Sequence, residues 1–569
     1  MRVADQIVEF ISEFCSPKVF LLTGNGAMYI NDAMQIHPNI DYVCVRNEAV
    51  APVAASAYSQ ISGKVGTVCV TAGPGAANAM PGVVEAWVDG VSIFVISGQV
   101  PSSELINYKK DLRTFGIAGI PVIDYVQQFT KLAISLQSAE ELENSLEDIL
   151  LALRIGRPGP VWLDVPLDIQ ATESKPINFS AMNERVRVKL NKELQSKPIN
   201  LQTSEILTAI ENANRPLFIL GTGCVAVIED GSLIEWLRNT NAVFALTRPV
   251  AHKIPLEVEG NLGVIGVRGR PWSKEVFEKT DLIVALGTRL PTSLVGSNYS
   301  YLNPNTTILL INSEDTELLK HQSRVLKISP TRVEDFIGDS EIAQRFKKNN
   351  KMQSWLDEII RITDKKSLAF EVNLDQPLNL YWFCSNIEKF LNSSNVVTTD
   401  AGSNYYATGQ SMTFNYGQRE VTSGTFAAMG ISVPLALGAS VAVDQTYRTV
   451  CITGDGSIEL NVQELQTISN YGMNIAIFVI NNGGYASMRT WQDTFFESRY
   501  IGSTDDTGTK PMNFFKIAEA FNLKYEKISN SKDFEDKIEY ILESSTPTLV
   551  EVMCDPNQLL ELPMNSDVV

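Results

Sequence analysis

The chain has 569 residues, of which 44% are hydrophobic, and this size predicts three domains with large buried cores. Its formal charge is −18, from 65 acidic and 47 basic residues, which argues against nonspecific nucleic-acid binding because such binding requires phosphates to be neutralised. No run approaches the ~18 apolar residues of a membrane helix, and the acidic amino-terminal pattern is unlike a secretory signal, so we expect no membrane partner and a cytoplasmic location.

The seven cysteines are scattered without CxxC pairs, and several lie in apolar runs, which predicts buried reduced thiols. Only three histidines are present, His37, His252 and His321, and none lies in a recognisable motif. This scarcity argues against a hydrolase triad or a zinc site. We therefore expect the chemistry to come from carboxylates, amides or a cofactor.

The first region, residues 1–175, alternates helical patterns with short apolar strands. These strands are KVFLLTG, DYVCVRNE, GTVCVTAGPG, SIFVISGQ and GPVWLDVP. Apolar strands separated by helices predict a parallel sheet in an α/β fold. Lys175–Lys197 is polar and of mixed charge, with prolines nearby, so we predict a linker there.

Residues 195–340 and 376–569 repeat this rhythm and predict two further α/β domains. The strands of the second region are PLFILGTG, VFALTR, DLIVALGTR and TILLINSE, and those of the third are VVTTD, TVCITGDG, NIAIFVINN and TLVEVM. Between them, Gly338–Pro377 is rich in charge and predicts a helix plus a linker. The short polar stretch from Pro556 predicts a tail or a flap.

Glu48 follows the strand Asp41–Val45 and precedes an alanine-rich helix. A carboxylate at the start of a helix often only compensates the helix dipole. However, Gly24 and Gly26 follow one further strand and Gly73 follows another, at the same edge of the predicted sheet. Because these small residues leave room for a flat ring beside Glu48, a binding or catalytic role is the alternative.

In the third region, Gly454-Asp455-Gly456-Ser457 follows one strand and Asn481-Asn482 follows the next. The segment could be an ordinary turn and the pair an ordinary loop. Together, however, they place a carboxylate and an amide oxygen at one sheet edge, beside a helix amino-terminus that favours anions. Mg²⁺ suits such a site because substrate phosphates can complete its coordination. The pattern therefore predicts a metal-bound diphosphate.

Several stretches of the chain resemble the thiamine diphosphate (ThDP) enzymes of the acetolactate synthase and pyruvate oxidase group. They are Val45–Trp87, Gly156–Asp168, Val421–Ala439 and the GDG…NN pattern, and the likeness runs over about Val3–Asp555. The resemblance implies three doubly wound parallel-sheet domains. In chain order they are a domain that binds the pyrimidine, a central domain and a domain that binds the diphosphate. The resemblance also implies a homodimer or homotetramer with active sites at the subunit interface.

The resemblance assigns roles to individual residues. Glu48 would hydrogen-bond the aminopyrimidine and thereby activate the thiazolium carbon, and Met429 would bend the cofactor. Asp455, Asn482 and the backbone carbonyl of Gly484 would hold Mg²⁺. The cofactor-binding positions are Gly24, Gly26, Gly73, Ser403, Asn404, Ala427, Met429, Gly456 and Ser457. Ala427 stands where the family has glycine, and Ser403-Asn404 where it often has Gln-His.

In acetolactate synthases the central domain binds FAD, although the reaction needs no net redox step. The matching positions here are Gly221, Gly223, Arg289 and Asn312, and Asn312 replaces a usual acidic residue. Glycine-rich turns are common in α/β domains, so a turn without a ligand is the alternative. The resemblance favours FAD as a third cofactor.

Trp491 matches a tryptophan with which acetolactate synthases favour a 2-oxo acid acceptor, whereas Ser487 and Met488 stand where the family has Met and Val. A polar triplet of the family becomes Ile117-Ala118-Gly119, and the pocket opened at Ala118 would suit a bulky acceptor. We therefore expect a carboligase that decarboxylates pyruvate and transfers the two-carbon unit to a ketone such as a nucleotide 4-keto-deoxysugar. Acetolactate synthase, a 2-oxo acid decarboxylase, an oxidase and a non-catalytic homologue are the alternatives.

Overall fold

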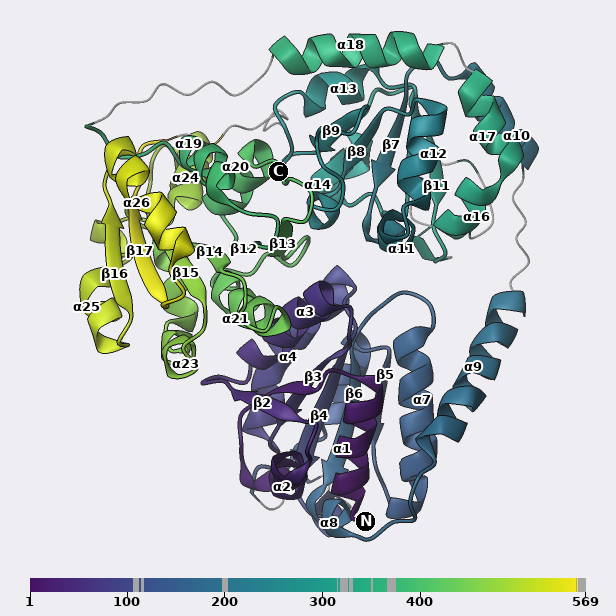
Figure 1. Ribbon diagram of the computed structural model, residues 1–569, viewed down its shortest axis with the longest axis vertical. Helices are drawn as coiled ribbons and strands as arrows, with labels where there is room; N and C mark the ends of the chain where they lie inside the picture. Colours follow the sequence, from purple (N-terminus) through teal and green to yellow (C-terminus); the bar gives the residue numbers. More distant parts are fainter. Residues whose placement is uncertain are drawn as a thin grey trace.

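The computed structural model consists of three parallel α/β domains (Figure 1). It describes residues 1–105, 112–113, 117–196, 203–314, 316–317, 326, 331–348, 351–365, 375–558 and 560. Every strand pair within the three sheets is parallel, and the predicted α/β class with three doubly wound domains is confirmed. The domain limits 1–175, 195–340 and 376–569 stay predictions.

The first sheet has the strand order β2-β1-β3-β4-β6-β5. Its strands are β1 Lys18–Leu21, β2 Asp41–Cys44, β3 Gly66–Val70, β4 Ile93–Gln99, β5 Leu132–Ser135 and β6 Val161–Pro166. The helices are α1 Val3–Phe14, α2 Met28–Ile36, α3 Val50–Ser62, α4 Pro74–Asp89, α5 Ser102–Leu105, α6 Val122–Val126, α7 Leu142–Arg154, α8 Leu167–Ala171 and α9 Phe179–Ser196. Strand β4 is buried along its whole length, because helices cover both faces of the sheet.

The linker predicted at Lys175–Lys197 is wrong for most of that range, because α9 occupies it. Met182 and Val186, one helical turn apart, are fully buried in the core of the first domain. Arg185, on the same helix, pairs with Glu143 and Glu147 of α7. The polar composition concealed a narrow apolar stripe that is sufficient to pack one helix face.

The central sheet has the order β11-β10-β7-β8-β9. Its strands are β7 Pro216–Leu220, β8 Phe244–Leu246, β9 Asn261–Val264, β10 Leu282–Leu286 and β11 Thr307–Ile311. Its helices are α10 Thr203–Asn212, α11 Val225–Glu229, α12 Ser232–Thr240, α13 Ser273–Lys279, α14 Thr292–Val295, α16 Val333–Gly338, α17 Ser340–Lys348 and α18 Lys351–Lys365.

The third sheet, β13-β12-β14-β15-β17-β16, repeats the topology of the first. Its strands are β12 Val396–Thr399, β13 Arg419–Thr422, β14 Thr449–Gly454, β15 Ile475–Asn481, β16 Lys524–Ile528 and β17 Thr548–Met553. Its helices are α19 Leu380–Ile387, α20 Ser403–Ser411, α21 Ser432–Ala442, α22 Asp455–Ile458, α23 Glu464–Asn470, α24 Ala486–Phe496, α25 Phe514–Ala520 and α26 Ser531–Glu543. In each of these two sheets the second strand lies on one side of the first strand and the third strand lies on the other side. Ligands bind at such switch points in open α/β sheets, outside the carboxyl ends of the strands.

Helices α3 and α21 join the first and third domains (Figure 1). Both are rich in small residues, and Val50, Ala54, Val433 and Leu437 share one buried cluster. The backbones approach so closely that a Cβ at Gly438 would lie 1.9 Å from the carbonyl oxygen of Ala54. Glycine at this position therefore sets the spacing between two domains.

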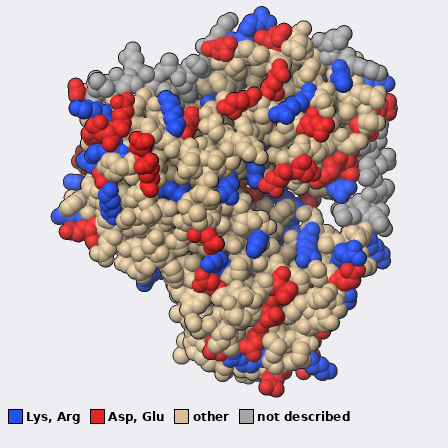
Figure 2. Space-filling view, in the orientation of Figure 1, with Lys and Arg blue, Asp and Glu red and all other residues tan. Residues whose placement is uncertain are grey.

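The described helices include none that is long and apolar enough to cross a membrane. All seven cysteines are free thiols, as predicted, and all except Cys44 are buried. On the face shown in Figure 2, acidic and basic side chains are interspersed.

We predict that Gly438→Ala lowers the free energy of unfolding by about 1–3 kcal/mol or more, because the added methyl group forces α3 and α21 apart. Denaturation monitored by circular dichroism measures this loss. Gly338→Ala is the matched control, since a Cβ there meets nothing within 4 Å. Equal stabilities of the two variants would contradict the close-packing argument.

Candidate active site

Asp455 lies at the carboxyl edge of the third sheet, at the start of α22, and is almost completely buried. Its Oδ1 accepts a hydrogen bond of 2.8 Å from the backbone N–H of Gly456. Its Oδ2 accepts 3.1 Å and 2.9 Å bonds from the backbone N–H groups of Asn482 and Gly484. The carboxylate thus joins the GDG turn to the NNGG loop, as the strand order of β14 and β15 allows.

Burial raises the pKa of Asp455 to about 6, although its backbone donors oppose the shift. Asn482 is also buried, and Gly483 and Gly484 take φ angles of 78° and 100°, which favour glycine. One carboxylate, one amide and one backbone carbonyl therefore meet at this edge. This hard-oxygen set fits Mg²⁺ when a diphosphate supplies further oxygens. The described residues contain no group of three or more His, Cys, Asp or Glu side chains that could hold a metal ion. The oxygen set at this edge is of a different kind, since it has only one carboxylate.

The amino-terminus of α20 faces the same edge. Gly402 precedes the helix with a φ of 73°, and Ser403 and Asn404 form its first turn. Asn404 is buried beside Gly454, and its Oδ1 has no hydrogen-bond partner within the protein. Such an orphaned polar atom, next to free backbone N–H groups at a helix start, suits a site for a bound polar group.

The residues around the GDG turn are closely packed. A Cβ at Gly456 would lie 2.1 Å from the ring of Tyr485, and a Cβ at Gly402 would lie 3.5 Å from Oγ of Ser487. Gly456 thus accommodates the Tyr485 ring. Ser457 is buried, and its side chain lies close to Gly454. The structure therefore brings together the positions predicted to bind the metal and diphosphate, with Ser487 beside them.

Ala427 and Met429 lie in the loop between β13 and α21. Ala427 has a φ of 48°, which an L-residue adopts at a cost of about 1–2 kcal/mol, and this explains why glycine is usual there. Its N–H donates a 2.9 Å bond to Oγ of Ser423. The Met429 side chain is 38% exposed, so it does not belong to a buried core.

Asp89, at the carboxyl end of α4, holds this loop. It accepts bonds of 2.7 Å from the Ser423 hydroxyl, 3.0 Å from the Gly424 N–H and 2.9 Å from the Thr425 N–H. Desolvation raises the pKa of Asp89 in spite of these donors. A carboxylate of the first domain thus shapes the loop that carries Ala427 and Met429.

Glu48 lies at the opposite end of α4, at the carboxyl edge of the first sheet. Its Oε2 accepts a 3.2 Å bond from Asn78, and its Oε1 lies 3.5 Å from where a Cβ at Gly75 would be. Thr71 fills the space next to Gly24, and its hydroxyl accepts a 3.0 Å bond from the N–H of Gly26. The predicted small-residue edge is present, half-buried and adjacent to the Glu48 carboxylate.

One chain does not bring Glu48 and the Ala427–Met429 loop together. Gly75, next to Glu48, and Asp89, which holds the loop, are separated by most of α4, about 21 Å along its axis. The Ala427 N–H donates to the Ser423 hydroxyl, which in turn donates to Asp89. Ala427 therefore lies at the Asp89 end of α4, away from Glu48. Within a single chain, therefore, Glu48 and the Ala427–Met429 loop belong to two separate groups of residues.

The substrate-pocket positions lie in two places. Ala118 is exposed with a φ of 64°, and its carbonyl lies against Gly73, where a Cβ would approach it to 2.2 Å. Residues 114–116 of the same segment lie outside the described residues. On α24, Met488 is 47% exposed, and Trp491 stacks on Phe495 with ring centroids 5.6 Å apart.

The central-domain positions predicted for FAD are used within the protein. Cβ atoms at Gly221 and Gly223 would lie 2.5 Å and 2.7 Å from atoms of Gly287, so close packing of two turns accounts for these glycines. Asn312 bonds its own chain at Thr288 and Glu314, while Arg289 donates a 2.6 Å bond to Thr425.

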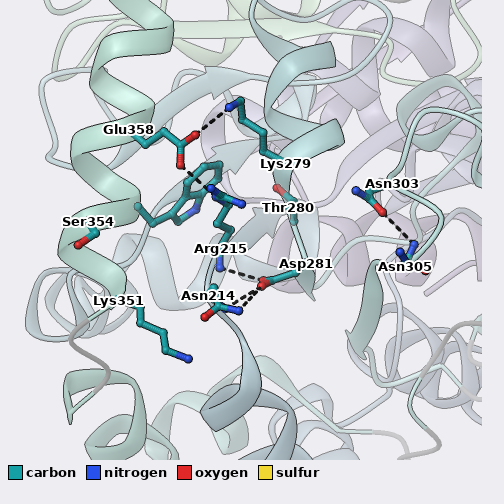
Figure 3. A pocket seen from close by; sticks show the side chains of 11 residues that line it. Asn214, Arg215, Lys279, Thr280, Asp281, Asn303, Asn305, Lys351, Ser354 and Glu358 are labelled. Carbon is teal, nitrogen blue, oxygen red and sulfur yellow. Dashed lines mark hydrogen bonds and ion pairs between the residues drawn. The ribbon is translucent and has the colours of Figure 1, made fainter.

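A polar pocket of about 630 Å³ lies at the other, amino-terminal edge of the central sheet (Figure 3). Its two carboxylates are already paired within it, because Asp281 accepts from Asn214 and Arg215, and Glu358 accepts from Arg215 and Lys279. None of the predicted site residues lines it.

Sequence reasoning missed Asp89, Tyr485 and Arg489. Each acts through contacts that motif spacing does not show. Asp89 binds a loop more than 330 positions away, and Arg489 binds backbone carbonyls rather than a side chain.

Comparisons with known proteins agree with this arrangement. Residues 1–122, 203–330 and 400–552 match the N-terminal TPP binding, central and C-terminal TPP binding domains of thiamine pyrophosphate enzymes. The chain is 26% identical to the acetolactate synthase large subunit of Lactococcus lactis, covering 98% of this chain and 93% of that protein. It is 26% identical to the Buchnera aphidicola large subunit (strain APS), covering 94% and 91%, and 25% identical to chloroplastic acetolactate synthase 1 of Zea mays, covering 99% and 86%. With its three domains in this order, the chain belongs to the acetolactate synthase-like thiamine pyrophosphate enzymes.

Proposed function

We propose that this enzyme is a ThDP- and Mg²⁺-dependent carboligase that decarboxylates pyruvate and transfers the two-carbon unit to a carbonyl acceptor. The observation that carries the proposal is the convergence of Asp455, Asn482 and Gly484 on one buried point. The names of the relatives, which are acetolactate synthases, support pyruvate as the donor. A non-catalytic homologue would have no need of this ligand set.

In this proposal, ThDP supplies the carbanion that cleaves and forms carbon–carbon bonds. The residues of the chain hold and orient it. Asp455, Asn482 and the Gly484 carbonyl hold Mg²⁺, while Ser403 and Asn404 at the start of α20 donate to the diphosphate. The Glu48 carboxyl group would give a proton to the ring nitrogen of the aminopyrimidine and, as a carboxylate, accept the hydrogen bond of the resulting N–H, which favours the imino tautomer. Ala427 and Met429 would support that ring.

We propose that the acceptor is a bulky ketone, such as a nucleotide 4-keto-deoxysugar, as in synthases of the CDP-4-aceto-3,6-dideoxygalactose type. Two features support this choice: Ala118 and Gly119 present no polar side chain, and the segment is exposed above Gly73. Trp491 and the relatives favour the second candidate, acetolactate synthase with pyruvate as acceptor. Labelled pyruvate incubated with 2-oxo acids, simple ketones and nucleotide 4-ketosugars tests both, with products read by mass. Labelled acetolactate as the sole product would contradict the ketone proposal.

A simple 2-oxo acid decarboxylase and an oxidase are the remaining alternatives. Of the two described histidines, His37 bonds Glu9, and burial lowers the pKa of His252 to about 3, so neither is suited to protonate a carbanion at the site. Release of free acetaldehyde, or oxygen uptake with pyruvate, would favour these alternatives instead.

We predict that Glu48→Gln lowers pyruvate turnover by about 100-fold or more while ThDP still binds, because the amide cannot exchange a proton with the ring nitrogen of the aminopyrimidine. Turnover and ThDP binding by circular dichroism are measured together. Glu235→Gln, on the surface of the central domain, is the control and keeps normal turnover. Near-normal turnover of Glu48→Gln would refute the catalytic role.

We also propose that the enzyme is a homodimer or a homotetramer, with each active site built from two chains. The separation of Glu48 from the Ala427–Met429 loop by the length of α4 supports this. In a twofold dimer the first domain of one chain would face the third domain of the other.

Mixed dimers test this arrangement. A dimer of one Glu48→Gln chain and one Asp455→Ala chain, isolated with two different tags, should show about half the wild-type activity, since one of its two sites is intact. Asn482→Ala replaces Asp455→Ala if the latter does not fold. Sites contained within one chain would leave every mixed dimer inactive.

We propose FAD as a further cofactor of the central domain, supported by the resemblance and by the placement of Gly221, Gly223, Arg289 and Asn312 after neighbouring strands. Absorbance of the purified protein at the flavin bands tests it, and a colourless protein that cannot be reconstituted would contradict it. The seven free thiols support a reducing, cytoplasmic location.

A further inference from the structure

Arg489 lies in the first turns of α24, directly after the metal loop. Its Nη2 donates bonds of 2.8 Å to the carbonyl of Asn482 and 3.1 Å to that of Pro556. Its Nη1 donates bonds of 2.9 Å to the carbonyl of Gly483 and 3.1 Å to that of Ser503. One guanidinium thus binds four backbone carbonyls from three separate segments.

The metal loop is therefore fixed from two sides. On one side, the Asp455 carboxylate accepts hydrogen bonds from the N–H groups of Asn482 and Gly484. On the other, Arg489 donates hydrogen bonds to the carbonyls of Asn482 and Gly483.

The Gly484 carbonyl accepts a 2.9 Å bond from the Ala486 N–H. The second lone pair of this carbonyl and the Asn482 side chain are then the groups left for a ligand. When groups that hold a metal's own ligands by hydrogen bonds are removed, the affinity for the metal commonly falls.

Arg489 forms no ion pair with a carboxylate of the described residues. Its five N–H donors lie in a rigid plane, and the four carbonyls match that geometry. A lysine at this position could bind fewer of the four carbonyls, because its ammonium is a single compact group with three N–H donors.

The same contacts connect the metal loop to the segment that follows α24. Ser503 is held by Arg489 and also by the buried Gln492, whose Oε1 accepts a 2.5 Å bond from the Ser503 hydroxyl. Gln492 further donates a 3.0 Å bond to the carbonyl of Ile501. Movement of the loop carbonyls would therefore be transmitted to residues 501–503.

We propose that Arg489 is a positioning residue that holds the metal loop in its ligating conformation and couples metal binding to the order of residues 501–503. The inference rests on the proposed metal site at Asp455, Asn482 and Gly484. Arg489 itself touches neither substrate nor metal in this proposal.

Mn²⁺ serves as the probe, because it accepts oxygen ligands like those of Mg²⁺ and is visible by electron paramagnetic resonance. The full chain with ThDP is titrated with Mn²⁺ as wild type, Arg489→Gln, Arg489→Lys and Arg499→Gln. Arg499 is the matched control, since its side chain is 66% exposed and, among the described residues, forms an ion pair only with Glu497. We expect about 10- to 100-fold weaker Mn²⁺ binding for Arg489→Gln, partial recovery for Arg489→Lys and no change for Arg499→Gln.

Hydrogen exchange provides the second readout. Mn²⁺ with ThDP should slow amide exchange at residues 501–503 in the wild type and in Arg499→Gln, but not in Arg489→Gln. Mn²⁺ affinity of Arg489→Gln within twofold of the wild type, or equal protection of residues 501–503, would overturn the inference. If Arg489→Gln does not fold, the same criteria apply to Arg489→Lys. A wild type without ThDP-dependent Mn²⁺ binding would instead contradict the proposed function itself.

Discussion

The buried carboxylate of Asp455 is the contact on which the arrangement of the diphosphate edge depends. It accepts three backbone N–H groups from two loops that follow neighbouring strands, and these donors offset part of the cost of burying a charge. The loops can meet only because β14 and β15 are adjacent and parallel. The order of the strands in the sheet therefore determines how Asp455 and the Asn482 loop lie relative to each other.

Around this contact, backbone conformation limits which residues can stand at the edge. Gly402, Gly483 and Gly484 adopt positive φ angles, so they permit turns that other residues would strain. Ala427 adopts such an angle without being glycine, and the Ser423 and Asp89 bonds hold it there. Strain of this kind persists where surrounding contacts fix the backbone, which is common at functional sites.

The sequence sufficed to predict the three parallel-sheet domains, because each strand is a short apolar run followed by glycine or polar residues. It also placed Asp455 beside Asn482, because parallel strands end at one edge of the sheet. The linker prediction at α9 failed, because two buried side chains, Met182 and Val186, are too few to dominate a polar composition. Asp89 could not be predicted, because it binds a loop more than 330 positions away. Arg489 could not be predicted, because its partners are backbone carbonyls, which leave no signal in the sequence.

Helix α4 gives Glu48 and the Ala427–Met429 loop of a chain a common support. Its first turn lies against Glu48, and its last residue, Asp89, holds the Ala427–Met429 loop. In the proposed dimer these two ends would belong to different active sites. The 16 residues of α4, with Pro81 in the interior of the helix, would then join the two sites. The helix that separates Glu48 from the Ala427–Met429 loop within one chain would thus lie between the two sites of the proposed dimer.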